Sequence, residues 1–205
     1  MNSQYDEAKV GSSVREGQGI RTYRRSFAEI TFTDGSAIRV NEQTDLIVQS
    51  AAALRRIRLE QGALWVKDEN GSRTSVQTPV GTATARGTEF IVSADGNVSV
   101  KAGSVDLEAK GVVVTIEAGQ TGGIGPGGTP EKLGSGVPDG NNWYDKGQAL
   151  PVPTLTLGGL AGVIGANVGA GGNRNQGGNP VPEPTTVLAF GAGAVYLLRR
   201  RARKS

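Results

Sequence analysis

The stretch Ala28-Glu29-Ile30-Thr31-Phe32-Thr33-Asp34-Gly35, followed by Ile38 and Val40, decides the fold class of this chain. Apolar residues alternate with polar residues along it, which is the period of a half-buried strand. Asp-Gly is a residue pair that tight hairpin turns prefer. The stretch therefore predicts two short antiparallel strands joined by a turn.

The same combination of alternating residues and a turn pair recurs further along the chain. The later turn pairs are Asn70-Gly71, Asp95-Gly96 and Lys110-Gly111. Short strands at such regular spacing predict an all-β domain, which can be a sandwich, a roll or a small solenoid. The segments Gln61-Gly62-Ala63-Leu64-Trp65-Val66 and Ala102-Gly103-Ser104-Val105-Asp106-Leu107 look like one repeated unit, which gives the solenoid some support.

The composition excludes several classes of chemistry. The 205 residues include no histidine and no cysteine. Ser-His-Asp and Cys-His nucleophile systems are therefore excluded, as are the usual zinc sites that contain histidine. We expect no catalytic residue, no cofactor and no metal ligand. A cryptic glycoside hydrolase stays open as a minor alternative, because Asp106, Glu108 and Glu117 could pair, although nothing in the sequence fixes their separation.

Several polar and aromatic side chains of the β domain have a structural interpretation and a functional one. We expect Trp65 to belong to a sheet face rather than to serve as a platform for a sugar ring. The arginines at positions 21, 24, 25, 55, 56 and 58 are interspersed with apolar residues, and a solvated sheet face explains most of them. Without a basic patch, we expect no nucleic-acid partner.

Residues 125–180 differ in composition from the β domain that we place at 10–124. Between Gly125 and Asn179 lie 16 of the 32 glycines, with five prolines and only six charged residues. Such a segment cannot bury a core of its own and is expected to be a flexible linker. Within it, residues 141–150 carry Trp143 and Tyr144, which could dock on the β domain or bind a partner.

The C-terminal residues 181–205 form a third type of segment. Val181-Pro182-Glu183-Pro184 is followed by an uncharged apolar run over 185–198 and then by a basic end over 199–204. As a helix, these 14 apolar residues reach about 21 Å, short of the roughly 30 Å hydrocarbon core. We expect one short transmembrane helix that spans only with snorkelling or local thinning of the bilayer.

The basic end orients this predicted helix. It consists of Arg199, Arg200, Arg201, Arg203 and Lys204. Basic residues beside a span stay on the cytoplasmic side, so everything before the span lies across the membrane. The remaining 17 Lys and Arg residues face 19 Asp and Glu residues, so the rest of the chain carries about −2 rather than +3.

The order of these three features is similar to a known sorting signal. Pro182, Glu183 and Pro184, the short span and the arginine cluster resemble a PEP-CTERM signal of Gram-negative bacteria that make extracellular polysaccharide. The resemblance implies that a membrane-embedded exosortase cleaves the tail. A permanent C-terminal anchor is the alternative that the span alone leaves open.

Residues 10–124 also resemble a family. The resemblance rests on the segment from Val10-Gly11 to Arg21-Thr22, on the opening stretch and above all on two short motifs. Those motifs are Thr78-Pro79-Val80-Gly81 and Arg86-Gly87-Thr88-Glu89-Phe90. They look like a FecR-type domain, a periplasmic or extracellular β module. We assign Thr78, Pro79, Gly81, Arg86, Gly87, Thr88 and Phe90 a structural role. Arg86 and Glu89 are the functional alternative, a recognition pair.

The N-terminus does not supply the export signal that these resemblances call for. Residues 1–17 contain no apolar core of about 7 to 15 residues. The FecR pattern usually has a further strand before Val10. We therefore expect residues 1–9 to be the remnant of a longer N-terminus.

Together the resemblances imply an exported, non-enzymatic surface or extracellular-matrix protein. Its FecR-like β domain would bind or support an extracellular polysaccharide or envelope component. The implied route starts in the inner membrane, with the C-terminus cytoplasmic and the β domain periplasmic, and ends at the cell surface or outside after tail cleavage. The alternative is an envelope-sensing module of a FecR-like sigma-regulator system, which would need a cytoplasmic segment and a span ahead of the β domain.

Overall fold

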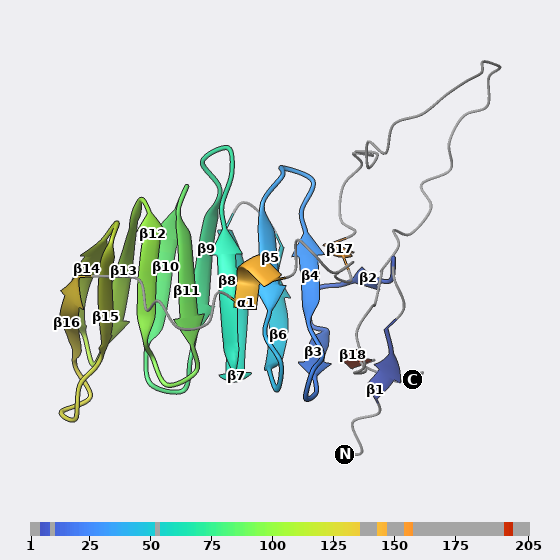
Figure 1. Cartoon of the computed structure of the whole chain (residues 1–205), viewed down its shortest axis with the longest axis horizontal. Coiled ribbons are helices and arrows are strands. Elements are labelled where there is room, and N and C mark those ends of the chain that lie inside the picture. Colours follow the sequence, from blue (N-terminus) through green and yellow to red (C-terminus); the bar gives the residue numbers. More distant parts are fainter. Residues whose placement is uncertain are drawn as a thin grey trace, which may run out of the picture.

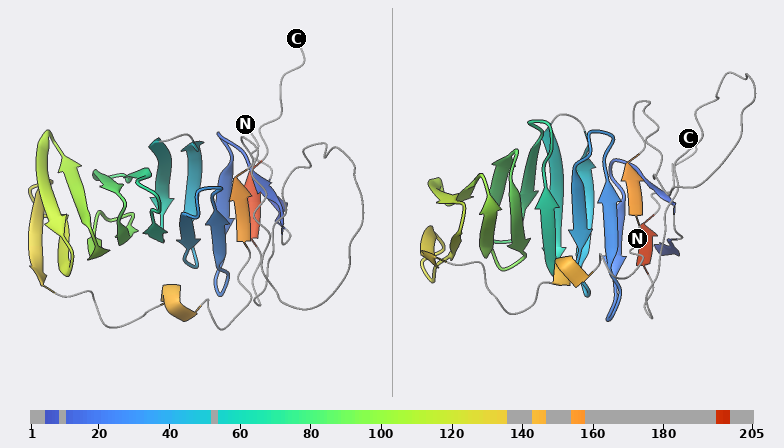
Figure 2. Two further views of the ribbon diagram at one scale, coloured as in Figure 1. Left: turned by 90° about the horizontal axis from the view of Figure 1, so that it is seen from above. Right: turned by 45° about the horizontal axis from the view of Figure 1, so that its top comes forward.

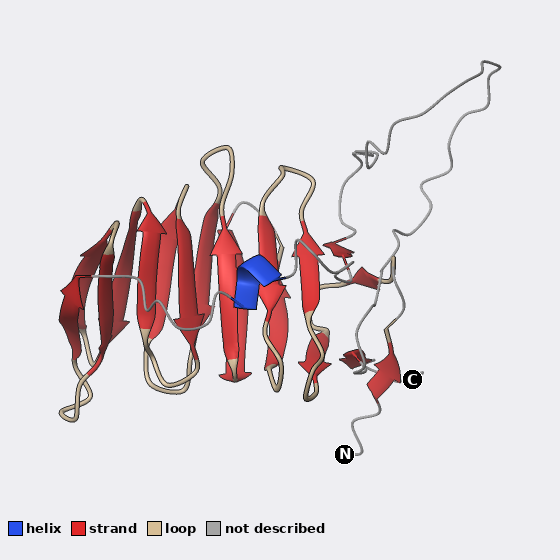
Figure 3. Cartoon of the chain, in the orientation of Figure 1, coloured by secondary structure: helices blue, strands red, loops and turns tan. Residues whose placement is uncertain are grey.

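The computed structural model describes residues 5–8, 11–51, 54–135, 143–146, 154–157 and 195–198. In this part of the chain the regular elements are strands, with the exception of one short helix, α1 (Trp143–Lys146) (Figure 3). Two nine-stranded sheets face each other and form an elongated two-layer domain (Figure 1). The predicted all-β class is confirmed.

Each sheet runs along the whole length of the domain. Sheet I contains, in spatial order, β1 (Tyr5–Glu7), β18 (Val195–Leu198), β3 (Gly19–Thr22), β6 (Asp45–Ser50), β7 (Leu54–Gln61), β9 (Arg73–Gln77), β10 (Thr82–Arg86), β13 (Ser104–Ala109) and β14 (Val112–Glu117). Sheet II contains β16 (Pro130–Ser135), β15 (Gln120–Ile124), β12 (Val98–Ala102), β11 (Glu89–Ser93), β8 (Ala63–Lys67), β5 (Ala37–Val40), β4 (Ala28–Thr31), β17 (Thr154–Leu157) and β2 (Ser13–Val14).

The chain winds between the two sheets as it advances along the domain. The pair β4 and β5 in sheet II is followed by β6 and β7 in sheet I, then by β8 in sheet II, and by β9 and β10 in sheet I. The pairs β11–β12, β13–β14 and β15–β16 continue the alternation. The cross-section is thus a sandwich, while the path of the chain resembles a solenoid (Figure 2).

Single glycines carry the chain from one sheet to the other. Gly62 connects β7 to β8 with a φ of 86°, and a Cβ atom there would lie 2.6 Å from Thr44 Cα. Gly103 connects β12 to β13 with a φ of 79°. Because only glycine adopts this conformation readily, both crossings depend on it. The two similar segments in the sequence, residues 61–66 and 102–107, therefore both form a glycine crossing from one sheet to the other.

The core lies between the two sheets and is mostly aliphatic. The largest fully buried side chains are Phe90, Ile20, Ile30, Ile38, Leu46, Ile57, Leu59, Leu64, Leu107, Ile116 and Val14. Along β4, buried and half-buried residues alternate as the opening stretch predicted. Burying each of these side chains contributes about 1.5–3 kcal/mol, so the alternation accounts for much of the driving force for folding.

Three of the four predicted hairpins are confirmed and one is wrong. The turns at Asp34-Gly35, Asp95-Gly96 and Lys110-Gly111 join β4 to β5, β11 to β12 and β13 to β14 as antiparallel neighbours. Asn70-Gly71 instead leads from β8 in sheet II to β9 in sheet I. Both edges of β8 are occupied by β5 and β11, so β8 has no free edge for β9.

The sheets extend into the segment for which we predicted a linker. Strand β16 pairs with β15, so regular structure continues beyond residue 124, and β17 pairs with β2 and β4. Helix α1 lies on the outer face of sheet II, in front of β5 and β8 (Figure 1). The prediction that 125–180 lacks packed structure is therefore wrong for β16 and β17, whereas docking of residues 141–150, which include α1, was one of the two alternatives.

The apolar tail also contributes a strand. Val195–Leu198, the last four residues of the predicted span, form β18 between β1 and β3. The remainder of the span, residues 185–194, lies outside the described residues. Within the part that the structure describes, no helix is long and apolar enough to cross a membrane.

Candidate functional site

An aromatic and charged cluster covers the middle of the outer face of sheet II. Trp65 on β8 points away from the core, and Tyr144 of α1 stacks on it with ring centroids 6.3 Å apart and an interplanar angle of 4°. Trp143 meets Tyr144 edge to face at 5.8 Å. The segment after the sheets is therefore fixed to the domain by aromatic contacts, as one of the two alternatives for residues 141–150 predicted.

Two cations lie over the faces of the aromatic pair. The Arg39 guanidinium lies 4.7 Å from the centroid of the Trp65 ring and donates a hydrogen bond to the backbone carbonyl of Tyr144. Lys101 Nζ lies 4.7 Å from the centroid of the Tyr144 ring. Cation–π contacts of this kind contribute about 0.5–2 kcal/mol each, depending on exposure.

Two carboxylates complete the cluster. Glu29 Oε2 accepts a hydrogen bond from Arg39 Nε at 2.6 Å. Glu89 Oε1 accepts from Trp65 Nε1 at 3.1 Å and lies 2.7 Å from Lys101 Nζ. Trp65 is left only 6% exposed, so it is not an open platform for a ligand. Its contacts favour the structural role that we predicted for it.

The Thr78-Pro79-Val80-Gly81 motif forms the turn between β9 and β10. Thr78 Oγ1 accepts a hydrogen bond from Gly81 N at 3.1 Å, and Thr78 N donates to the Gly81 carbonyl at 2.8 Å. A Cβ atom on Gly81 would lie 2.7 Å from the Glu108 carbonyl oxygen, so the turn packs closely on β13. Pro79 sits at the tip of the turn, where no backbone N–H is needed.

The Arg86-Gly87-Thr88-Glu89-Phe90 motif takes the chain from β10 in sheet I to β11 in sheet II. Gly87 has a φ of 60° at the crossing. Thr88 is 1% exposed, with Oγ1 at 3.0 Å from the Ser104 carbonyl, and Phe90 is fully buried. Glu89 contacts Lys101 and Trp65 rather than Arg86, which is exposed on the other sheet. This geometry fits a structural motif better than a recognition pair of Arg86 and Glu89.

A buried charge cluster ties the Asp34 turn to the Asp68 end of β8. Arg55 is 4% exposed and Asp68 is 6% exposed. Arg55 Nη1 donates to Asp68 Oδ1 at 3.2 Å, and Nη2 pairs with Asp34. The Arg55 guanidinium also lies 4.2 Å from the centroid of the Phe32 ring. Arg55 is therefore an exception to the solvated sheet face that we expected for most of these arginines.

The pKa values of the two aspartates of this cluster are shifted in opposite directions. Burial raises the pKa of Asp68 to about 6, although the hydrogen bond from Thr74 Oγ1 and the Arg55 charge act in the opposite direction. Burial also tends to raise the pKa of Asp34, but the Ser36 hydrogen bond and Arg55 outweigh it and the pKa is lowered. Among the described residues, Asp68 Oδ2 and Arg55 Nε have no hydrogen-bond partner.

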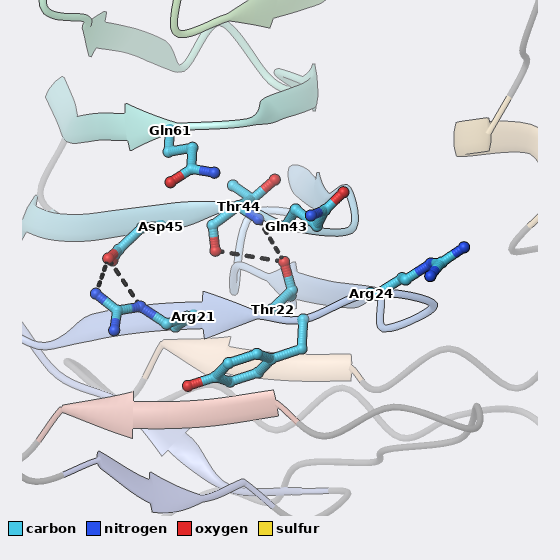
Figure 4. A pocket seen from close by; sticks show the side chains of 8 residues that line it. Arg21, Thr22, Arg24, Gln43, Thr44, Asp45 and Gln61 are labelled. Atoms are coloured by element: carbon cyan, nitrogen blue, oxygen red, sulfur yellow. Dashed lines mark hydrogen bonds and ion pairs between the residues drawn. The ribbon is translucent and has the colours of Figure 1, made fainter.

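An open polar groove lies at the ends of β3, β6 and β7 (Figure 4). It has a volume of about 480 Å³. The charged, amide and aromatic side chains that line the groove are those of Arg21, Tyr23, Arg24, Gln43, Asp45 and Gln61. Arg21 Nε donates to Asp45 Oδ2 at 2.9 Å, while Tyr23 is 46% exposed.

Two turns position Tyr23 at this groove. Its carbonyl accepts hydrogen bonds from Ser26 N at 3.0 Å and from Gln43 N at 3.3 Å. Arg25 and Gln43 both have positive φ values, 60° and 52°, which non-glycine residues rarely adopt. An exposed ring beside amide, carboxylate and guanidinium groups can bind a polar ligand with one apolar face. The sequence analysis missed this groove, because Tyr23 and Gln61 are far apart in the sequence.

The carboxylates of the hydrolase alternative lie on a different surface. Asp106, Glu108 and Glu117 are all exposed on the outer face of β13 and β14, and Asp106 accepts a hydrogen bond from Thr115 Oγ1 at 2.7 Å. Within the described ranges, no three acidic side chains are grouped so that they could hold a metal ion. The sorting-motif residues Pro182, Glu183 and Pro184 and the basic end lie outside the described residues.

Two families match separate parts of the chain. The FecR protein family matches residues 18–106, within the two-sheet domain. The PEP-CTERM protein-sorting motif matches residues 180–204, which include β18. No curated protein matches the chain at a significant level.

The fold is shared with two crystal structures of a candidate anti-sigma factor from Parabacteroides distasonis, determined at 1.65 and 2.50 Å resolution. Both are 19% identical to this chain with a TM-score of 0.53. The matches cover 62% of this chain and 64% and 63% of those chains, so this chain spans less than two thirds of their length. At this identity the similarity concerns the fold alone. The protein thus contains a FecR domain, matched over residues 18–106, and ends in a PEP-CTERM protein-sorting motif, matched over 180–204.

Proposed function

We propose that this is an exported, non-enzymatic protein of the cell surface or extracellular matrix, sorted by an exosortase through its tail. The observation that carries the proposal is the order of the two matches, a FecR domain followed by a PEP-CTERM motif. In this proposal the chain starts in the inner membrane with its basic end cytoplasmic and its β domain periplasmic. Cleavage near Pro182 to Pro184 then releases the domain to the outside.

The β domain would act as a binding or structural module. The groove around Tyr23 supports a binding role, because it is an open surface lined by polar side chains next to an exposed aromatic ring. The Trp65 surface supports a structural role, because α1 covers it. We propose an extracellular polysaccharide or another envelope component as the ligand, without a nucleic-acid partner.

The sorting step is tested by intact mass and location of the native protein in its own cells, with and without the exosortase. We expect a released form ending near residue 182 to 184 in the wild-type strain. In the strain without exosortase, the uncleaved chain should accumulate in the membrane. An uncleaved protein in both strains would contradict sorting and indicate a permanent anchor.

The binding step is tested with polysaccharide purified from the same cells. Wild-type protein should sediment with the polymer, and Tyr23→Ala should reduce the bound fraction several-fold. Val80→Ala, a change at an exposed residue in the β9–β10 turn, is the matched control and should bind as the wild type does. Equal sedimentation of all three proteins would contradict a role for the groove.

A signalling module is the second candidate. It is favoured by the two solved structures with the same fold, both described as candidate anti-sigma factors. Deleting the gene and comparing transcripts tests it, because an envelope-sensing regulator should change the expression of a defined set of sigma-factor-dependent genes. An unchanged transcript profile, with the protein still released from the cell, would favour the surface module.

A further inference from the structure

The sorting tail and the β domain share one strand. On one side of β18, Tyr196 is opposite Arg21 and Leu197 is opposite Ile20 of β3, in antiparallel register. On the other side, Tyr196 is opposite Glu7 of β1. Strand β18 therefore fills the position between β1 and β3, and it covers the edge of sheet I that β3 would otherwise present.

The same four residues belong to the sorting motif. They are the last residues of the apolar run that we expect to enter the membrane, and the motif match over 180–204 includes them. A backbone inside the hydrocarbon core must satisfy its own N–H and C=O groups, as a helix does. In β18 these groups pair with neighbouring strands instead. Docking on the sheet and insertion in the membrane are therefore mutually exclusive.

The local sequence is compatible with both arrangements. Gly191 and Gly193 weaken a helix in water, while Val195 and Tyr196 are residues that favour strands. In lipid, glycine is tolerated in helices and the apolar run is stabilised. The residue types of the tail are therefore compatible with a strand on the sheet and with a helix in lipid.

We infer that the β3 edge is a binding site for the chain's own tail, and that docking of Val195–Leu198 there withholds the tail from the membrane and from cleavage. The consequence for cleavage rests on the proposed sorting by exosortase, whereas the strand pairing does not. Removal of the tail leaves the β3 backbone over Gly19–Thr22 open on one side, next to the groove around Tyr23.

Engineered disulfides test the pairing directly, because the full chain contains no cysteine. Residues directly opposite each other in neighbouring strands are close enough for a disulfide. Arg21→Cys combined with Tyr196→Cys should form an intramolecular disulfide in most of the purified full-length protein after mild oxidation. The control combines Thr115→Cys, at the far end of sheet I, with Tyr196→Cys and should stay reduced.

Peptide mapping of the oxidised proteins distinguishes the outcomes. No disulfide in the first variant, or equal disulfide formation in both, would overturn the inference. Disulfides between chains would also overturn it and would assign the β3 edge to the tail of a second copy. If Arg21→Cys disturbs folding, Glu7→Cys with Tyr196→Cys tests the other neighbour of β18.

A second measurement in cells tests the effect on cleavage. The oxidised Arg21→Cys, Tyr196→Cys protein should give at least tenfold less processed product than either single variant. Normal processing of the disulfide-linked protein would overturn the withholding of the tail while leaving sorting intact. If even the wild type is not processed, the proposed sorting fails, and the disulfide experiment still decides the strand pairing.

Discussion

Tyr144 lies parallel to Trp65 across the outer face of sheet II, with 6.3 Å between the ring centroids. The two residues are far apart in the sequence, and Tyr144 lies beyond the FecR match that ends at residue 106. This contact extends the folded unit beyond the matched region. It also explains why Trp65 is only 6% exposed although its side chain points away from the core.

Removing the Tyr144 ring should expose Trp65. In a Trp143→Phe background, which leaves Trp65 as the single tryptophan, Tyr144→Ala should shift the fluorescence to longer wavelength and increase quenching by acrylamide. We expect stability to fall by about 1–2 kcal/mol, because a stacked pair and a cation–π contact are lost. Tyr23→Ala in the same background is the control, and an equal shift in both variants would contradict the stacking.

Asp68 should make stability depend on pH. Its pKa is raised from 3.8 to about 6, so between these values the native state binds the proton more tightly than the unfolded chain does. The free energy of unfolding should therefore rise, by about 2 kcal/mol, as the pH falls from 7 to 4.5. Urea unfolding at a series of pH values measures this change.

Asp68→Asn should flatten that pH dependence, since the amide does not titrate. Asp106→Asn, the same substitution at an exposed position of β13, should leave it unchanged. Measurements should stay above pH 4.5, because Asp34 has a lowered pKa and its contribution is lost at more acidic pH. An unchanged slope in Asp68→Asn would show that another group titrates.

The crossing at Gly62 should tolerate no side chain. Gly62→Ala would place Cβ 2.6 Å from Thr44 Cα at a φ of 86°, so a backbone atom must move. We expect a loss of about 3 kcal/mol or more from strain and overpacking together. Gly71→Ala is the matched control, because Gly71 also has a positive φ of 72° but no atom lies within 4 Å of the added Cβ.

The free energy of unfolding of both variants, measured by heat or urea, separates the cost of the left-handed backbone conformation from the cost of the close contact with Thr44. Gly71→Ala should lose only about 1–2 kcal/mol, the cost of a left-handed conformation for a residue with a Cβ atom. Equal losses in the two variants would mean that the contact with Thr44 relaxes easily. In that case the crossing depends on backbone conformation alone.

The sequence was sufficient to predict hairpins that have local signals, but not the strands β16, β17 and β18 or the crossings between the sheets. Alternation along Ala28 to Phe32 and the Asp34-Gly35 turn are local signals, and both are confirmed in β4 and β5. Asn70-Gly71 carries the same local signal, yet it crosses between sheets because β5 and β11 occupy both edges of β8. Which strands occupy the two edges of β8 depends on the whole sheet, so it cannot be predicted from the residues of one turn.

The candidate sites were harder to predict for the same reason. Arg55 has the sequence surroundings of a surface arginine, and its burial depends on Asp34 and Asp68, which other turns bring to it. The groove around Tyr23 combines three separate segments. The tail was predicted from its apolar run as a helix, whereas the strand Val195–Leu198 depends on pairing with β3 and β1, which are far away in the sequence.

Thr88 and Arg86 allow the structural role of the Arg86-Gly87-Thr88-Glu89-Phe90 motif to be tested. Thr88 is buried and its hydroxyl lies 3.0 Å from the Ser104 carbonyl, whereas Arg86 is exposed. Thr88→Val keeps the shape but removes the donor, so it should destabilise the domain by about 1–3 kcal/mol. Thr88→Ser retains the hydroxyl and should lose about 1 kcal/mol, the value of one buried methyl group.

Arg86→Ala should change stability by no more than about 0.5 kcal/mol, as surface substitutions usually do. Unfolding in urea measures all three variants on the same scale. If the motif is structural, stability should follow the burial of each residue, and the sedimentation of Arg86→Ala with polysaccharide should equal that of the wild type. A loss of sedimentation in Arg86→Ala with stability unchanged would instead restore Arg86 as a recognition residue, because only a contact with the ligand would then be missing.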